Sequence, residues 1–136
     1  MINEYIIVTT FCDKEEIANK IVDTLLEKRL VAGCQLSKVH SKYWWNNELE
    51  ECDEYKLEFR TKESLFTEIE NEIKKIHDYE IAEISFVEIS GGSKEFLNWI
   101  DNSINSIGKW IIFIIINILI SVRYSCKLIY IYRNTS

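Results

Sequence analysis

The stretch from Ser37 to Lys62 constrains the fold of this chain more than any other. An aromatic cluster, Tyr43-Trp44-Trp45, is followed by Asn46-Asn47 and then by an acidic run that leads into a second β-prone segment. Asparagine tolerates the left-handed backbone that a tight hairpin turn requires. The pattern therefore predicts a long antiparallel hairpin with the asparagine pair at its tip.

The second strand of this hairpin alternates between apolar and charged residues. Tyr55, Leu57 and Phe59 share one side, and charged residues occupy the positions between them. Because successive side chains of a strand point to opposite faces, one face has to be covered and the other faces water. We expect the cover to come from a helix, from another subunit or from both.

Segments on both sides of the hairpin supply the other elements. The β-branched run after Glu4 predicts a central strand, and the capping-box spacing of Asp13 and Glu16 predicts a helix that reaches about Leu30. Beyond the hairpin, apolar residues at helical spacing up to Ile76 predict a second helix. A strand is expected over 81–89, followed by a glycine break and a short helix that Ser93 caps.

This order of elements predicts an α+β fold, the ferredoxin-like βαββαβ sandwich with a short C-terminal helix and an extra apolar tail. In that fold two helices cover one face of a four-stranded antiparallel sheet, and the other face is left needing a partner. We expect the ferredoxin-like domain to span residues 1–106.

Residues 107–136 form an apolar, basic C-terminal extension of unknown role. It contains ten isoleucines and no acidic residue. Its apolar core from Trp110 to Val122 is shorter than the roughly 20 residues that span a bilayer. A membrane partner is therefore not expected, except through this extension.

Charge and cysteine content exclude several classes of function. All 22 acidic residues lie at or before Asp101 with 12 of the 16 Lys and Arg, so this part carries −10. Such a surface repels phosphate backbones, and nucleic acid is not an expected partner. The four cysteines show no Cys-x-x-Cys spacing, and the chain does not start with a signal-peptide pattern, which together favour a cytoplasmic protein with free thiols.

Several motifs together resemble the CutA family of divalent-cation tolerance proteins. They are Ser41-Lys42-Tyr43-Trp44-Trp45, Phe59-Arg60-Thr61-Lys62, the run from His77 to Ile84, and Phe96-Leu97-Asn98-Trp99-Ile100, in the family's order over about Tyr5 to Ile104. The resemblance implies a ferredoxin-like subunit in a tight homotrimer made by pairing long hairpins. It also implies a link to copper and other divalent ions, and no established catalytic reaction.

The chain departs from the family pattern at three places. Asn46-Asn47 replaces the usual Glu-Gly, which keeps the turn chemistry. Asp78 and Ala82 replace the two prolines of the family's His-Pro-Tyr-Glu-x-Pro-Glu, so the loop loses two fixed φ angles. The thiol of Cys34 falls one place later than in the family, which on a strand means the opposite face.

Thiols and imidazoles are the candidate ligands for copper or another divalent metal. They are found at Cys12, Cys34, Cys52, His40 and His77, with carboxylates at Glu50, Glu51 and Glu83. His77, which matches the family's histidine, and Cys52 are the ligands we expect first. None of these residues has metal-ligand spacing, so a site would have to assemble from distant segments or across subunits. The other reading of His77 is a cap on the dipole of its helix.

The aromatic cluster and the acidic run after His77 supply the candidate binding residues: Tyr43, Trp45, Tyr79 and Glu83. Tyr79, Glu80 and Glu83 are expected to line a cleft beside the aromatic cluster, and the alternative is simple loop packing. Two or more of the three aromatic residues are expected at a subunit interface, where aromatic side chains are enriched.

Three functions remain in view. The first is a non-enzymatic homotrimer involved in divalent metal (copper) tolerance. The second is a thiol-dependent enzyme that uses Cys34 or Cys12 with His40 or His77, or else a small-ligand-binding signalling module related to trimeric ferredoxin-like regulators. The third is an RNA-recognition module, which shares the order of elements but lacks here its aromatic and basic strand signature.

Overall fold

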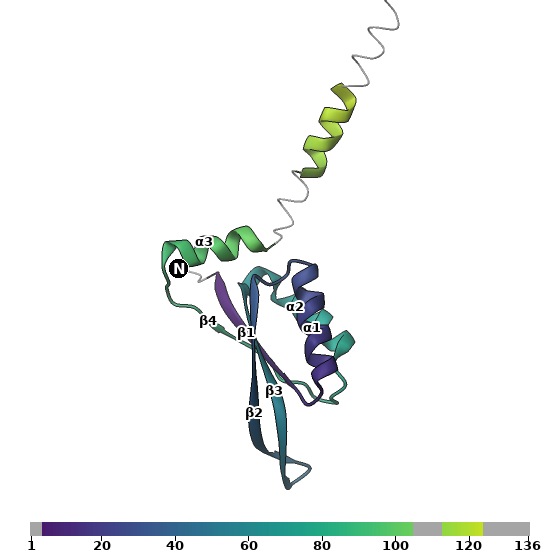
Figure 1. The fold of residues 1–136 in the computed structure, drawn as a ribbon, viewed down its shortest axis with the longest axis vertical. Helices are drawn as coiled ribbons and strands as arrows, with labels where there is room; N and C mark the ends of the chain where they lie inside the picture. The colour runs from purple at the N-terminus through teal and green to yellow at the C-terminus, as the bar shows by residue number, and fades with distance from the viewer. Residues whose placement is uncertain (1–3, 105–112, 124–136) are drawn as a thin grey trace, which may run out of the picture. The chain divides into compact units, whose positions relative to one another are not determined.

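Four antiparallel strands form one sheet in the order β2-β3-β1-β4. The computed structural model describes residues 4–104 and 113–123. The strands are β1 (Tyr5–Cys12), β2 (Gly33–Trp45), β3 (Glu48–Lys62) and β4 (Ile84–Glu88), and the helices are α1 (Glu15–Glu27), η1 (Glu63–Leu65), α2 (Phe66–Ile76) and α3 (Lys94–Ser103). Helices α1 and α2 lie on the same side of the sheet (Figure 1). This arrangement confirms the expected ferredoxin-like α+β fold.

The core lies between the sheet and the two helices. Alternate residues of β1 and β3 meet the apolar stripes of α1 and α2, and all of these side chains are fully buried: Ile6, Val8, Leu57, Phe59, Ile21, Leu25, Ile69 and Ile73. Burial of one such side chain contributes roughly 1.5–3 kcal/mol. Since Leu57 and Phe59 are among them, the chain's own helices cover this part of the hairpin.

The predicted hairpin is confirmed, with its turn at Asn46 and Asn47. Their φ angles are 50° and 62°, and a two-residue turn with two positive φ angles suits the right-handed twist of the strands. The hairpin extends past the helices (Figure 1). Near its tip Trp44 lies opposite Leu49 in the strand register, and these side chains are 70% and 69% exposed.

Helix α1 differs from the prediction at both ends. Lys14, not Asp13, is the N-cap residue, and no side chain caps this end, so the predicted capping box is wrong. The helix ends at Glu27, where Arg29 takes a left-handed φ of 52°. The Leu30 amide donates to the Leu25 carbonyl and the Arg29 amide to the Leu26 carbonyl, both at 3.0 Å, which is the pattern of a Schellman motif.

Strand β4 is shorter than the predicted 81–89. It begins at Ile84, and Ile81 is 70% exposed in the loop that follows α2. The Ser93 cap is confirmed, because its Oγ accepts a hydrogen bond of 3.2 Å from the Phe96 amide at the start of α3.

The chain divides into two units, Met1–Ile104 and Asn105–Ser136. In the second unit residues 113–123 are helical, and all of them are exposed within the chain. Residues 107–112 and 124–136 of the predicted extension lie outside the described residues. No helix within 4–104 or 113–123 is long and apolar enough to cross a membrane.

Candidate functional site

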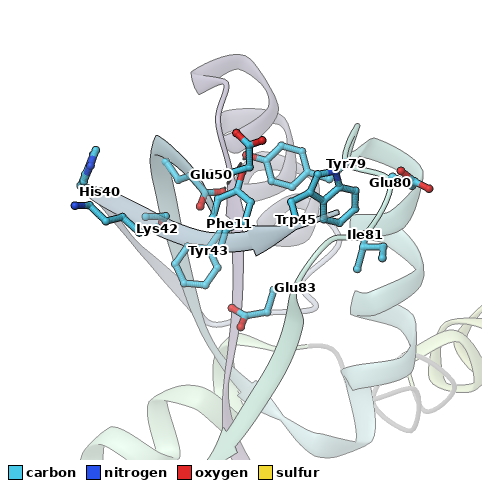
Figure 2. A pocket seen from close by; sticks show the side chains of 12 residues that line it. Phe11, His40, Lys42, Tyr43, Trp45, Glu50, Tyr79, Glu80, Ile81 and Glu83 are labelled. Carbon is cyan, nitrogen blue, oxygen red and sulfur yellow. Dashed lines mark hydrogen bonds between the residues drawn. The ribbon is translucent and has the colours of Figure 1, made fainter. Parts of the chain in front are cut away.

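A pocket of about 810 Å³ lies between the hairpin and the loop that joins α2 to β4. It is lined by Phe11, His40, Ser41, Lys42, Tyr43, Trp45, Glu50, Glu54, Tyr79, Glu80, Ile81 and Glu83 (Figure 2). Strand alternation places Phe11, Tyr43 and Trp45 on the sheet face opposite the one that α1 and α2 cover. The pocket therefore forms on the face that the sequence left without a partner.

The four predicted binding residues all line this pocket. Tyr43 and Trp45 come from β2, whereas Tyr79 and Glu83 come from the α2–β4 loop. Trp45 and Tyr79 lie toward each other in Figure 2, and His40 lies at the other end. The structure thus brings the predicted residues together, and their role in binding stays a prediction.

Sequence reasoning missed Phe11, Glu54 and Ile81 as pocket residues. Phe11 ends a core strand, and Glu54 lies in an acidic run that is typical of a solvated strand. Their position follows from the way the loop after α2 folds over the hairpin, which no local spacing reveals. The one local signal was the position of Ile81 directly after the predicted Tyr79 and Glu80.

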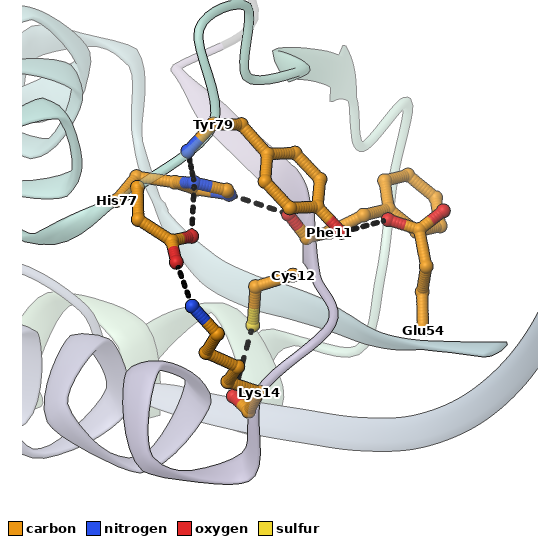
Figure 3. A network of polar contacts seen from close by, with 7 residues as sticks. Phe11, Cys12, Lys14, Glu54, His77 and Tyr79 are labelled. Atoms are coloured by element: carbon orange, nitrogen blue, oxygen red, sulfur yellow. Dashed lines mark hydrogen bonds and ion pairs between the residues drawn. The ribbon is translucent and has the colours of Figure 1, made fainter. Parts of the chain in front are cut away.

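Glu54 is the most buried carboxylate of the pocket. Its residue is only 8% exposed, and Oε2 accepts a 2.9 Å hydrogen bond from the Tyr79 hydroxyl (Figure 3). Burial raises the pKa of Tyr79, and the bond to Glu54 raises it further, so the hydroxyl keeps its proton and acts as a donor. This bond fixes the loop against the hairpin.

His77 lies beneath this loop, and its side chain is 1% exposed. Its Nε2 donates to the Phe11 carbonyl at 2.5 Å, and its Nδ1 accepts from the Tyr79 amide at 3.1 Å (Figure 3). The pair of bonds requires the tautomer with the proton on Nε2. Both ring nitrogens are therefore occupied, and in this arrangement His77 positions Tyr79 and offers no lone pair to a metal.

Cys52 is half-buried on β3 and lies near the pocket wall. Its Sγ is 3.7 Å from the Tyr43 hydroxyl, and this contact raises the pKa of Tyr43. Neither His77 nor Cys52 belongs to a metal-binding group. Within the described ranges, no three His, Cys, Asp or Glu side chains lie close enough together to hold a metal ion. The residues present do not fit a preformed copper site in one chain.

His40 is held between two carboxylates on β3. Its Nδ1 lies 2.6 Å from Asp53, and its Nε2 bonds to Glu51. The bond to Asp53 first, and then the bond to Glu51, raise the pKa of His40. A protonated ring is favoured here, so this histidine is a poor lone-pair donor.

Two of the thiols proposed as nucleophiles are deactivated by their surroundings. Burial raises the pKa of Cys12 and of Cys34 to about 11. The nucleophilic form of cysteine is the thiolate, which is scarce near neutral pH when the pKa is this high. The geometry gives no support to catalysis by either residue.

The fold and the pocket define a small ferredoxin-like α+β protein whose projecting hairpin borders an aromatic and acidic pocket. The sequence model of the CutA1 divalent ion tolerance protein family matches residues 6–103. The chain belongs to this family, which is named for tolerance and not for an enzymatic activity.

Individual relatives agree with this assignment. The divalent-cation tolerance protein CutA of Pyrococcus horikoshii is 35% identical over 95 residues, which cover 70% of this chain and 92% of the relative. The protein of the same name from Thermotoga maritima is 33% identical over 99 residues, which cover 73% of this chain and 98% of the relative.

Solved structures give the same result for the fold. CutA1 from Shewanella sp. SIB1 superposes with a TM-score of 0.74 at 28% identity, covering 78% of this chain and all of that one. The periplasmic divalent cation tolerance protein CutA of Archaeoglobus fulgidus gives 0.72 at 31% identity, with 74% and 99% covered.

Proposed function

We propose that this protein is a non-enzymatic homotrimer that takes part in the cell's response to divalent metal ions, copper among them. The family supports the link to divalent cations. The observation that carries the assembly is the uncovered apolar surface at the tip of the hairpin, where Trp44 and Leu49 are paired across the strands and more than two thirds exposed.

The edge of the sheet supports the same conclusion. β2 is an outer strand of 13 residues, and within the described part of the chain it pairs only with β3. A long free edge beside exposed aromatic side chains is a surface that another chain covers. The number of three copies comes from the resemblance to the family, whereas the geometry supports association as such.

The metal response in this proposal does not use a preformed centre within one chain. Cys52 is the predicted ligand whose thiol remains half-exposed, and an exposed thiol is a soft ligand that suits copper. His77 remains a predicted ligand, but a metal would displace its bond to Phe11 or to Tyr79.

The proposal also includes a cytoplasmic location and the absence of catalysis. Cys12, Cys34 and Cys52 are free thiols, as expected in a reducing compartment. The raised pKa values of Cys12 and Cys34 support a protein that does not use these thiols as nucleophiles. Cell fractionation tests the location, since one relative is described as periplasmic.

The assembly is tested by light scattering on the full chain and on a chain ending at Ser106, each with and without copper. The proposal expects three copies in every sample. The double variant Trp44→Ser and Leu49→Ser should dissociate while it stays folded. Leu26→Ser is the matched control, because Leu26 is 40% exposed on α1, away from the hairpin. A monomeric full chain contradicts the proposal.

A second function, small-ligand binding, is favoured by the pocket itself. It gathers four aromatic rings, from Phe11, Tyr43, Trp45 and Tyr79, with a few polar groups around one cavity, which is the usual composition of a small-molecule site. By strand alternation the exposed Trp44 and Leu49 lie on the face of the hairpin opposite to Tyr43 and Trp45, which line the pocket.

A further inference from the structure

We propose that the pocket binds a small organic cation, a substituted ammonium ion with an apolar body. The proposal rests on the ligand-binding function given above and does not depend on the number of subunits. It names the chemical class of the ligand from three properties of the pocket: its charge, its one buried carboxylate and its aromatic walls.

The charge of the pocket wall is strongly negative. Glu50, Glu54, Glu80 and Glu83 line it, against Lys42 and His40. These two basic residues are already occupied by acids that do not line the pocket. Lys42 lies 3.8 Å from Glu51, and His40 bonds to Glu51 and Asp53. No Lys, Arg or His in residues 4–104 or 113–123 forms an ion pair with the four pocket carboxylates.

Glu54 makes this charge imbalance costly for the folded chain. It is more than nine-tenths buried, and the hydrogen bond that it receives comes from a neutral hydroxyl, that of Tyr79. Buried carboxylates are ordinarily paired with a cation, because burial removes the water that stabilises the charge. A cation in the pocket would supply the missing partner.

The aromatic walls select the kind of cation. Trp45 and Tyr79 lie toward each other, and Tyr43 and Phe11 complete the apolar lining (Figure 2). A cation over the face of Trp or Tyr is attracted by the ring quadrupole, and the apolar body of an organic ion is buried against the same rings. Quaternary and primary ammonium groups fit both requirements.

A bare divalent metal ion fits this pocket less well. Metal ions require several oxygen, nitrogen or sulfur ligands at short range, and the described residues contain no group of three His, Cys, Asp or Glu side chains that could hold one. Aromatic carbon cannot replace a metal's water ligands. An ammonium ion needs no fixed coordination geometry, so carboxylates that are spread over the pocket wall can stabilise its charge.

The test compares three probes with one apolar body: 2-phenylethylammonium, 2-phenylethanol and phenylacetate. Binding to the full chain is measured by titration calorimetry, and the site is located from the indole N–H resonance of Trp45, assigned with Trp45→Phe. We expect the cation to bind on the order of tenfold more tightly than the alcohol, and the anion to bind more weakly than either.

Variants assign the effect to the pocket carboxylates. Glu54→Gln keeps an acceptor for the Tyr79 hydroxyl but removes the charge. It should weaken the binding of the cation about tenfold and leave the binding of the alcohol nearly unchanged. Glu83→Gln, on the exposed side of the pocket, should act in the same direction and serves if Glu54→Gln does not fold. Glu48→Gln is the matched control, because it removes the same charge from the same hairpin outside the pocket.

The outcomes separate the two proposals. If alcohol and cation bind equally at the Trp45 site, the ligand class is wrong and ligand binding stands. If no probe shifts the indole N–H resonance of Trp45, both the ligand class and the proposal of small-ligand binding are wrong. An effect of Glu48→Gln as large as that of Glu54→Gln also overturns the inference, because the preference would then reflect the general negative charge of the hairpin.

Discussion

Tyr79 and Glu54, 25 residues apart in the chain, are joined by a hydrogen bond of 2.9 Å from the tyrosine hydroxyl to the carboxylate. The bond connects the loop after α2 to the third strand of the sheet. Beneath it, His77 holds the Tyr79 amide and the Phe11 carbonyl (Figure 3). Three segments that are distant in sequence are thereby fixed around one pocket.

Tyr79→Phe should lower the free energy of unfolding by about 1–3 kcal/mol. The substitution removes the donor and leaves the buried carboxylate of Glu54 without a partner. Denaturant unfolding followed by circular dichroism measures the change. Tyr43→Phe is the control, because the Tyr43 hydroxyl makes an exposed contact with the thiol of Cys52. The free energy of unfolding should change by no more than about 0.5 kcal/mol in this variant. A loss equally large in a Glu54→Leu background, which offers no acceptor to the hydroxyl, would show that the hydrogen bond is not its cause.

His40 should make stability depend on pH. Asp53 and Glu51 raise the pKa of His40 in the folded chain above the usual value of about 6.5. The stabilisation is then fully present below the unfolded-state pKa and is lost as pH rises through the folded-state pKa. His40→Gln should flatten the stability profile in that window. An imidazole C–H titration by NMR with a midpoint at or below the unfolded value, or one unmoved in Asp53→Asn, contradicts this account.

The sequence predicts the framework of this molecule because its signals there are local. Period-two alternation in β3, helical spacing in α2 and the tolerance of asparagine for positive φ each act within a few residues. The predicted capping box was wrong although its signal was also local. Asp13 and Glu16 had the right spacing, but the helix begins one residue later, with Lys14 as its N-cap residue.

The site was less predictable because its contacts are distant. The bond from His77 to Phe11 spans 66 positions, and nothing near His77 in the sequence indicates that both ring nitrogens are used. Glu54 lies in an acidic run and becomes buried only when Tyr79 folds over it. Tyr43, Trp45, Tyr79 and Glu83 were anticipated by residue type and by the family resemblance, not by spacing.

Asn47→Val should lower the free energy of unfolding by about 1–3 kcal/mol. Asn47 has a φ of 62°, and a β-branched residue is strained in that region. Asn47→Gly is the control and should be neutral or stabilising, because glycine adopts positive φ without strain. Thermal unfolding ranks the three chains. Equal stability of the valine and glycine variants would mean that the turn does not keep its left-handed backbone in solution.

Gly33 and Trp99 should show coupled energetics. A Cβ added at Gly33 would lie 3.0 Å from the end of the Trp99 ring, closer than ordinary van der Waals contact. Alanine in a strand is otherwise favoured over glycine by roughly 0.5–1 kcal/mol. In the native background, displacement of the indole should cancel that gain or reverse it. In a Trp99→Ala background the same Gly33→Ala change should stabilise the fold, because the obstructing ring is gone.

A double-mutant cycle of denaturant unfolding gives the coupling energy between Gly33 and Trp99, expected to be about 0.5 kcal/mol or more. Additive effects would show that the half-exposed indole moves aside without cost, and that β2 and α3 are not in firm contact at this point.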